Sequence, residues 1–337
     1  MRETTWFCSS ADDILETGNK LIGNNSNYVD FSISRVLPVN IRVYSTSELY
    51  LNYLKDNFNT YDISSNIPII TLYYDRHNSI EQLKSVRPDL NLDIITPCAG
   101  LFDEVKNVGL ITGLDEYGLL TSTVHGLYSR LLFSNNWNPI HGAVIDLNGQ
   151  GTILIGHHGA GKSTALLNLI HYTKDIMRIN VLTDDWSVAR SEGSAIKICS
   201  IEKKMSFSES LVNANPELNL IDLYKNQALG GIGKLWIDID DVLGSGTSIQ
   251  ETTLKNVLIF SPNNGDELIT NISLDEAVHL LVDTSYHMPD CGEGIKERQL
   301  SFWNTSLKAI KFFQVDSRYS HLSKEKIYNL LVDYIIS

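Results

Sequence analysis

The sequence predicts an α/β protein built from two domains. At about 150 residues per domain, a chain of 337 residues is expected to form two. Short apolar runs rich in β-branched residues alternate with segments of helical composition, which indicates strands interleaved with helices. Between one such run and one such segment, near the middle of the chain, stands a glycine-rich loop. These three observations together place the chain in the α/β class.

The composition is that of a folded, acidic protein. Hydrophobic residues make up 43% of the chain and charged residues 20%, so a sizeable apolar core is expected. The formal net charge of −13 argues against nucleic acid and against an anionic membrane as partners, because both require a basic surface. It does not argue against phosphate, since a local cluster of backbone N–H groups can bind an anion within an acidic protein.

Zinc binding, secretion and membrane insertion are not expected. The four cysteines are widely spaced and include no C-x-x-C pair, so a zinc or redox motif is not predicted. The N-terminus lacks an apolar segment of signal-peptide length, and no apolar run approaches the length of a membrane span. We therefore expect a soluble, cytoplasmic protein with no membrane partner. The cysteines are Cys8, Cys98, Cys199 and Cys291.

The first part of the chain is expected to form a mixed α/β domain. It ends at a polar stretch, Asn135–Pro139, which closes with proline and precedes a new strand pattern. The predicted domains are therefore residues 1–135 and 136–337. Before the boundary we expect strands at Ile41–Tyr44 and Pro68–Tyr74, helices at Ser47–Leu54 and Ile80–Val86, and a hairpin that joins Val108–Thr112 to Leu119–Thr123.

The second part alternates strands and helices more regularly. A last helix is predicted from Ser323, a candidate N-cap, because apolar residues recur after it at helical spacing. The other expected elements are strands at Ile140–Leu147, Thr152–Ile155, Ile179–Leu182, Trp186–Ala189 and Ala195–Ile198, a helix beginning at Ala165–Ile170, a short helix at Ser206–Val212, and apolar runs at Leu235–Ile239 and Val257–Phe260.

The glycine-rich loop fits the phosphate-loop, or Walker A, pattern G-x-x-x-x-G-K-[ST]. The four fixed positions are Gly156, Gly161, Lys162 and Ser163. A predicted strand precedes the loop and a predicted helix follows it, which is the order that the pattern requires. Glycines allow the backbone N–H groups to turn toward one point, and the helix N-terminus adds its own. The loop therefore predicts nucleotide binding.

Each part of this loop has an expected role toward ATP and Mg²⁺. Lys162 is expected to reach the β- and γ-phosphates, and the hydroxyl of Ser163 to bind Mg²⁺. The whole predicted nucleotide site is Gly156, His157, His158, Gly159, Ala160, Gly161, Lys162, Ser163 and Thr164.

A pair of carboxylates follows the next predicted strand. Asp184 and Asp185 come directly after a short, mostly apolar segment, Asn180–Thr183. A strand that delivers a carboxylate beside a phosphate loop is a Walker-B-like arrangement, which holds the metal or accepts a proton. Adjacent residues on a strand point to opposite faces, so the two carboxylates need not share one task.

Residues 137–190 resemble the catalytic domain of HPr kinase/phosphorylase and of the related kinases of the phosphoenolpyruvate-carboxykinase type. The matching stretches run from Ile140 to Thr164 and from Leu182 to Asp185. The family has a His-Gly strand before its glycine loop, and His141-Gly142 stand there. It also has a paired-Asp element after the loop helix, and Asp184-Asp185 stand there. The resemblance implies a P-loop kinase core of that type, preceded by the mixed α/β domain.

The resemblance also implies roles. In that family one Asp acts as base toward the acceptor hydroxyl, while the loop Ser and an acidic residue hold Mg²⁺. Read in the family's order, Asp184 is the base and Asp185 lies on the metal side with Ser163. His141 is either a catalytic residue with Lys162 or a structural histidine. Because HPr kinases form hexamers, the resemblance further implies self-association.

The loop departs from the family at two places. His157-His158 stand where the family has Asp-Ser, and Thr164 stands where it has Glu. The acceptor is therefore open between a serine of a protein or peptide and a small alcohol. The expected function is an ATP- and Mg²⁺-dependent phosphotransferase with a hydroxyl acceptor. The alternative is a nucleotide-dependent binding or switch module with little or no acceptor phosphorylation. Such a module needs only one metal carboxylate.

Overall fold

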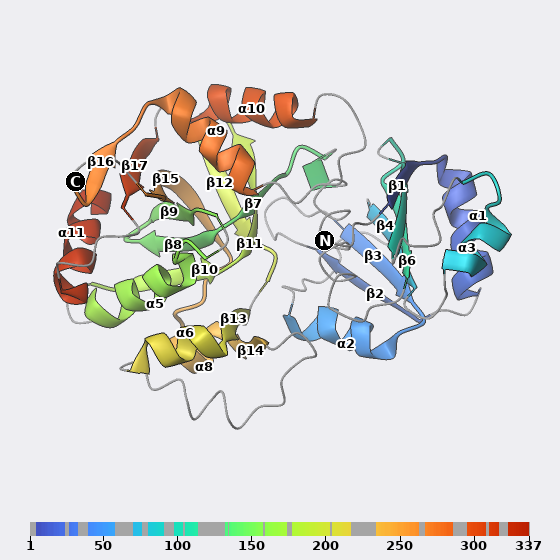
Figure 1. Ribbon diagram of the computed structural model, residues 1–337, viewed down its shortest axis with the longest axis horizontal. Helices are drawn as coiled ribbons and strands as arrows, with labels where there is room; N and C mark the ends of the chain where they lie inside the picture. Colours follow the sequence, from blue (N-terminus) through green and yellow to red (C-terminus); the bar gives the residue numbers. More distant parts are fainter. Residues whose placement is uncertain are drawn as a thin grey trace. The chain divides into compact units, whose positions relative to one another are not determined.

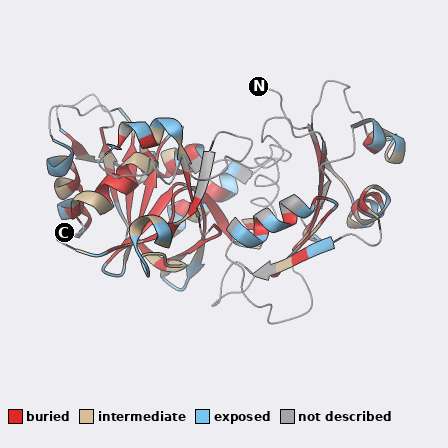
Figure 2. Ribbon diagram, turned by 90° about the horizontal axis from the view of Figure 1, so that it is seen from below, coloured by how far each residue is buried: buried red, intermediate tan, exposed pale blue. Residues whose placement is uncertain are grey.

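The computed structural model describes residues 5–23, 27–32, 40–57, 70–75, 80–90, 98–103, 105–113, 132–133, 135–157, 159–173, 177–202, 204–216, 234–262, 267–285, 295–307, 310–316 and 323–336. These residues form two compact units, which divide on the chain between Asn138 and Pro139. Both units combine helices with a mixed sheet, so the protein belongs to the α/β class (Figure 1). The strands of both sheets are largely buried (Figure 2).

The first unit is built on a sheet whose described strands follow the order β1-β5-β6-β4-β3-β2. Strands β3, β4 and β6 run parallel, whereas β2 and β5 join them antiparallel. Its elements are β1 (Thr5–Cys8), α1 (Ala11–Ile22), β2 (Asn27–Ser32), β3 (Asn40–Ser45), α2 (Glu48–Asn57), β4 (Ile70–Asp75), α3 (Ile80–Val86), β5 (Cys98–Asp103) and β6 (Val108–Gly113).

Helix α1 packs closely against strand β4 of this sheet. A Cβ at Gly18 would come within 2.7 Å of the Tyr73 ring of β4, so glycine lets the helix lie directly on that ring. Buried Ile14 of α1 and Leu83 of α3 belong to the same apolar cluster. The sequence did not predict α1, and it predicted β3 and α2 close to their observed bounds.

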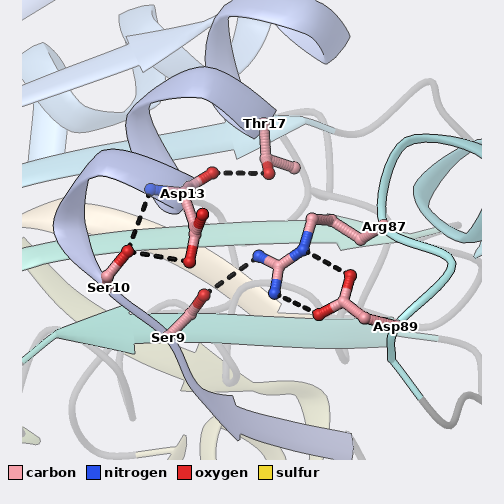
Figure 3. A network of polar contacts seen from close by, with 6 residues as sticks. All are labelled: Ser9, Ser10, Asp13, Thr17, Arg87 and Asp89. Carbon is pink, nitrogen blue, oxygen red and sulfur yellow. Dashed lines mark hydrogen bonds and ion pairs between the residues drawn. The ribbon is translucent and has the colours of Figure 1, made fainter.

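A polar network joins the start of α1 to the end of α3 (Figure 3). The Ser10 hydroxyl caps α1 by accepting a hydrogen bond from the backbone N–H of Asp13 at 3.2 Å. Arg87 donates from Nη1 to the Ser9 hydroxyl at 2.9 Å and from Nε and Nη2 to the Asp89 carboxylate at 2.8 and 2.6 Å. These bonds hold two segments together that lie far apart in the sequence.

The described residues include only the first strand of the expected hairpin. Val108–Gly113 is a strand, as expected, but its partners are β4 and β5. Leu119–Thr123, the second half of the expected hairpin, lies outside the described residues, and so does Pro68.

The second unit contains the larger sheet and the helices on its two faces. Its elements are β7 (Asn138–His141), β8 (Ala143–Leu147), β9 (Gln150–Ile155), α5 (Lys162–Thr173), β10 (Ile179–Thr183), β11 (Trp186–Glu192), β12 (Ala195–Ser200), β13 (Lys204–Ser208), α6 (Glu209–Ala214), β14 (Lys234–Asp238), α8 (Ile239–Leu243), β15 (Glu251–Phe260), β16 (Ile269–Asn271), α9 (Leu274–Ser285), α10 (Ile295–Ser306), β17 (Lys311–Val315) and α11 (Lys324–Ile336).

The larger sheet has the order β10-β8-β9-β15-β12-β11-β7, and β17 pairs with β15 and β16. Strands β9, β15 and β17 run parallel. Strand β8 runs antiparallel to both β9 and β10, so β9 and β10 point the same way. These four strands therefore all end at the same edge of the sheet, the one formed by their C-terminal ends. The last residues are Ile155, Thr183, Phe260 and Val315.

Two apolar cores cover the two faces of this sheet. One core joins the sheet to α5 and α11, and includes Leu154, Leu166 and Leu331. The other joins it to α9 and α10, and includes Ile155 and Trp303. Figure 1 shows α9 and α10 above the strands and α5 below them. We call these the α5 face and the α9 face.

The structure corrects the expectation of one strand over Ile140–Leu147. Two strands, β7 and β8, meet at Gly142, and they pair with different neighbours, β11 and β9. A Cβ at Gly142 would meet the Leu154 carbonyl oxygen at 2.6 Å, so only glycine fits this approach. The backbone N–H of Gly142 donates to the Asp185 carbonyl oxygen at 2.8 Å, which draws the chain out of a continuous strand.

The short helix expected at Ser206–Val212 is also corrected. Residues Lys204–Ser208 form β13, and α6 begins only at Glu209. Ser208 is the reason for the change at this point, because its hydroxyl accepts from the backbone N–H of Leu211 at 3.2 Å and caps the helix. The last helix is confirmed as α11, with the Ser323 hydroxyl 3.3 Å from the Lys326 amide.

None of the helices within the described ranges has the length and apolar character that a membrane span requires.

Candidate functional site

The glycine-rich loop connects the end of β9 to the start of α5. A Cβ at Gly156 would meet the Phe260 carbonyl oxygen at 2.6 Å, so the loop leaves the sheet pressed against the end of β15. Gly159 and Gly161 have φ of 79° and 95°, the left-handed region that glycine adopts without steric cost. The backbone N–H of Ala160 donates to the His157 carbonyl oxygen at 3.0 Å and closes a turn within the loop. His158 lies outside the described residues.

Lys162 is the first residue of α5 and folds back over the loop. Its Nζ donates to the Gly156 carbonyl oxygen at 2.8 Å, and the His157 carbonyl oxygen lies 3.5 Å away. The side chain is only 9% exposed, so the ammonium group is held at the mouth of the loop. Ser163 and Thr164 follow in the first turn, and both are partly exposed.

The start of α5 suits an anion. The first N–H groups of a helix have no partner within the helix, and the helix dipole places partial positive charge there. The first turn of α5 contains no acidic residue that would oppose a bound anion, and Lys162 adds a full positive charge. The turn therefore combines N–H donors with a cation, the two features that phosphate groups require.

The sheet register brings the predicted carboxylates to the same edge as this loop. Ala143 pairs with Leu154 of β9, and the next residue, Val144, pairs with Thr183 of β10. The loop follows β9 and the two aspartates follow β10, so both leave the sheet at the end where β8 begins. His141 and Gly142 directly precede β8. Residues from three separate stretches are thus gathered at one sheet edge.

Asp184 is buried at this edge. Only 2% of the residue is exposed, and Oδ2 accepts a hydrogen bond from the Ser206 backbone N–H of β13 at 3.1 Å. The neighbouring residue on β13, Met205, belongs to the apolar core that includes α5. The carboxylate of Asp184 therefore bonds to a strand that packs into the α5 core.

Asp185 is more exposed and faces a histidine. Its Oδ1 lies 2.8 Å from Nε2 of His141, with the two side chains 24% and 18% exposed. Two backbone N–H groups, of Asp185 and Trp186, each lie 3.2 Å from the Thr183 hydroxyl, which fixes the turn after β10. Together with the bond from Gly142 to the Asp185 carbonyl, this turn holds Asp185 against the start of β8.

His141 bridges Asp185 and the end of α9. Its Nδ1 lies 3.2 Å from the backbone carbonyl oxygen of Thr284. A carbonyl oxygen and a carboxylate are both acceptors, so the ring satisfies both when it carries a proton on each nitrogen.

Of the predicted site residues, the described loop residues, His141, Asp184 and Asp185 lie at the shared edge. Three further residues contact them there. Thr183, Ser206 and Thr284 were not predicted. Ser206 contributes a backbone N–H, which every residue except proline supplies, and Thr284 contributes a backbone carbonyl, so the sequence holds no signal for either. Thr183 is different, because a threonine before a turn often accepts backbone N–H bonds.

The residues at this edge include oxygen donors of the kind that hold Mg²⁺. No group of three or more His, Cys, Asp or Glu side chains in the described ranges is placed to hold a metal by itself. Nucleotide-bound Mg²⁺ does not need such a group, because phosphate oxygens and water fill most positions beside one hydroxyl and one carboxylate. The partly exposed Ser163 and a carboxylate at the same edge fit this donor set.

No protein-family model matches the sequence, and no curated protein matches it.

Proposed function

We propose that the protein is an ATP- and Mg²⁺-dependent kinase that transfers the γ-phosphate to a hydroxyl group. The observation that supports this most directly is the common sheet edge at which the loop with Lys162 and the pair Asp184-Asp185 end. Phosphoryl transfer depends on positioning and charge neutralisation, and it needs a phosphate cradle, a metal carboxylate and a group that accepts a proton. The second unit offers candidates for all three.

Each residue has a proposed task. The N–H groups of Gly156–Thr164 and the Lys162 ammonium bind the β- and γ-phosphates, and Lys162 exchanges its bond to the Gly156 carbonyl for phosphate oxygens. Ser163 and one aspartate hold Mg²⁺, which neutralises charge on the phosphates when bound. The other aspartate accepts the proton of the acceptor hydroxyl. The bond from the γ-phosphorus to the β,γ-bridging oxygen breaks, the acceptor oxygen bonds to phosphorus, and ADP leaves.

The core that we propose is a P-loop kinase core of the HPr kinase type. Strand β9, the loop and helix α5 follow the order that the phosphate-loop pattern requires. The His-Gly pair and the Asp-Asp pair of the resemblance lie at the same edge, with the Gly142 N–H bonded to the Asp185 carbonyl oxygen. The acceptor is a serine of a protein or peptide, or a small alcohol.

A transfer assay with γ-labelled ATP tests the proposal. The full chain is incubated with Mg²⁺ and, in separate reactions, free serine, glycerol, a serine-containing peptide pool or no acceptor. We expect ADP release that rises with one acceptor class and label that moves to it, and we expect Lys162→Ala to abolish both. Lys255→Ala, which removes an exposed lysine of β15, is the control and should retain full activity.

The same assay distinguishes the alternative. If ATP binds but ADP release is negligible and no acceptor raises it, the protein is a nucleotide-dependent switch module. If Lys162→Ala releases ADP as fast as the unaltered protein, the loop is not the nucleotide site and the kinase proposal is wrong.

A further inference from the structure

Two buried asparagines connect helix α5, which follows the glycine-rich loop, to the end of α6. Asn168 of α5 and Asn215, the residue after α6, are both 0% exposed. Nδ2 of Asn168 donates to Oδ1 of Asn215 at 2.9 Å and to the Thr164 carbonyl oxygen at 2.7 Å. Both partners are acceptors, so the NH₂ end of the Asn168 amide, and not its oxygen, must face them.

Asn215 is held from two further sides. Its Nδ2 donates to the Leu211 carbonyl oxygen of α6 at 2.8 Å, so its own oxygen is the end that faces Asn168. Nζ of Lys324, at the start of α11, lies 3.3 Å from the same Oδ1. Groups from α5, α6 and α11 therefore meet at the Asn215 amide.

The segment that ends at Asn215 also contacts the other half of the candidate site. Strand β13 runs directly into α6, and the Ser208 hydroxyl fixes the junction by accepting from the Leu211 N–H at 3.2 Å. In the middle of β13, the Ser206 backbone N–H donates to the Asp184 carboxylate at 3.1 Å. One short segment is therefore bonded to Asp184 through β13 and to the loop helix through Asn215.

These hydrogen bonds set the position of α5 in a way that its apolar contacts cannot. Leu166 of α5 and Val212 of α6 share an apolar core, but the hydrophobic effect has no direction and tolerates small slides and rotations. Hydrogen bonds are directional and fix one arrangement. Thr164, whose carbonyl oxygen meets Asn168, belongs to the first turn of α5 with Lys162. The direction of the N–H groups of that turn therefore depends on the two asparagines.

We propose that Asn168 and Asn215 are positioning residues of the nucleotide site. They fix the first turn of α5 to the β13–α6 segment and so hold its N–H groups in the direction that phosphate binding needs. This rests on the proposed function. Neither side chain has to touch the phosphates, because each acts through the backbone of α5. The link also works in reverse: a nucleotide that holds the first turn of α5 stabilises the β13–α6 segment against local opening.

Variants of the two asparagines, compared with a third buried asparagine, test this role in the full chain. Asn168→Asp keeps the shape of the side chain but turns a carboxylate oxygen toward two acceptors. Asn215→Leu removes Oδ1, whereas Asn215→Asp keeps an oxygen there. Asn256→Asp is the control, because Asn256 of β15 is 1% exposed in the same unit and its Nδ2 also has two partners. These are Thr152 Oγ1 at 3.3 Å and the Ile335 carbonyl oxygen at 3.2 Å.

Nucleotide affinity and stability are measured separately on each variant. A fluorescent ATP analogue that is not hydrolysed, titrated in saturating Mg²⁺, gives the Kd, and urea unfolding gives the stability. We expect Asn168→Asp and Asn215→Leu to raise the Kd by about 10- to 100-fold, the range typical of residues that orient a site from outside it. Asn215→Asp should recover part of this loss. Asn256→Asp should lower the stability and leave the Kd unchanged.

Hydrogen exchange of the backbone amides tests the reverse link. In the unaltered protein, saturating analogue should slow exchange in residues 204–215 more than in α10, and Asn168→Asp should remove most of that difference. Equal slowing of both segments in the unaltered protein would overturn the proposal, and this result needs no variant to fold. A normal Kd in Asn168→Asp, or an equal rise in Asn256→Asp, would overturn it too. If the unaltered protein binds no analogue, or Lys162→Ala binds it as well, the proposed nucleotide site itself is wrong, which is a different result.

Discussion

Lys162 and Gly156, at the two ends of the glycine-rich loop, are joined by a hydrogen bond of 2.8 Å from Nζ to the carbonyl oxygen. The bond ties the start of α5 to the end of β9 and closes the loop around its own backbone. Because the lysine is 9% exposed, its charge is satisfied by loop carbonyls and little by water. A bound phosphate offers the same ammonium a stronger, charged acceptor.

Mg-ATP is expected to raise the melting temperature of the protein, and Lys162→Ala should remove most of that rise. A ligand at one hundred times its Kd stabilises the native state by about 2.7 kcal/mol, and the variant loses the cation that meets the phosphates. Differential scanning fluorimetry with increasing Mg-ATP measures the shift. Lys255→Ala should behave like the unaltered protein, and an equal shift in Lys162→Ala would refute the loop assignment.

Gly156→Ala should destabilise the second unit and impair nucleotide binding. The new Cβ would meet the Phe260 carbonyl oxygen at 2.6 Å, which forces the loop away from β15 at a cost of about 1–3 kcal/mol. Gly193→Ala is the comparison, because Gly193 has φ of 62° and open space around its Cβ position. It should cost about 1 kcal/mol from backbone strain and leave binding intact. Urea unfolding and a nucleotide titration of each variant provide the measurements.

Ser323→Ala should lower the free energy of unfolding by about 1 kcal/mol, the usual value of a serine N-cap. Its hydroxyl accepts from the Lys326 amide at 3.3 Å at the start of α11, and α11 packs against α5 in the core. Ser301→Ala, on the exposed face of α10, should be neutral or slightly stabilising, since alanine has the higher helix propensity. If the two variants unfold at the same urea concentration, Ser323 is not a cap.

Asp89→Asn should lower the melting temperature of the first unit at pH 7 and have a smaller effect in acid. The hydrogen bonds from Arg87 lower the pKa of Asp89, so the folded state binds the proton less readily than the unfolded state. The Arg87–Asp89 pair therefore stabilises the folded state at pH values above the pKa of Asp89 in the unfolded chain, about 3.9. This stabilisation is lost as the pH falls through the lower pKa of Asp89 in the folded state. The effect is small, because Asp89 is exposed and water screens the pair.

Melting curves of Asp89→Asn and of the unaltered protein between pH 7 and pH 2.5 measure the difference in melting temperature between the two. Asp56→Asn, which changes an exposed carboxyl of α2 in the same unit, provides the control for the loss of one negative charge. If the melting temperature of Asp89→Asn falls further below that of the unaltered protein as the pH falls, the assigned role of the Arg87–Asp89 pair is contradicted.

The elements that the sequence predicted well are those set by neighbours along the chain. A short apolar run predicts strand β9, and helix-forming residues predict helix α5. The loop glycines stand at positions with positive φ. The cap at Ser323 is equally local, because the hydroxyl and the amide that it satisfies are three residues apart. For the same reason, β3 and α2 were expected close to their observed bounds.

The sequence itself determined that this protein carries a strand, a glycine loop, a helix and a nearby pair of carboxylates. Only the tertiary structure decided that Gly142 breaks a strand, that Asp184 meets β13, and that Asp185 meets His141 and, through it, α9. Those contacts join residues far apart on the chain, and several use a backbone C=O, which every residue supplies, or a backbone N–H, which every residue except proline supplies. The partner of each carboxylate is brought to it by tertiary packing, and no local pattern in the sequence records it.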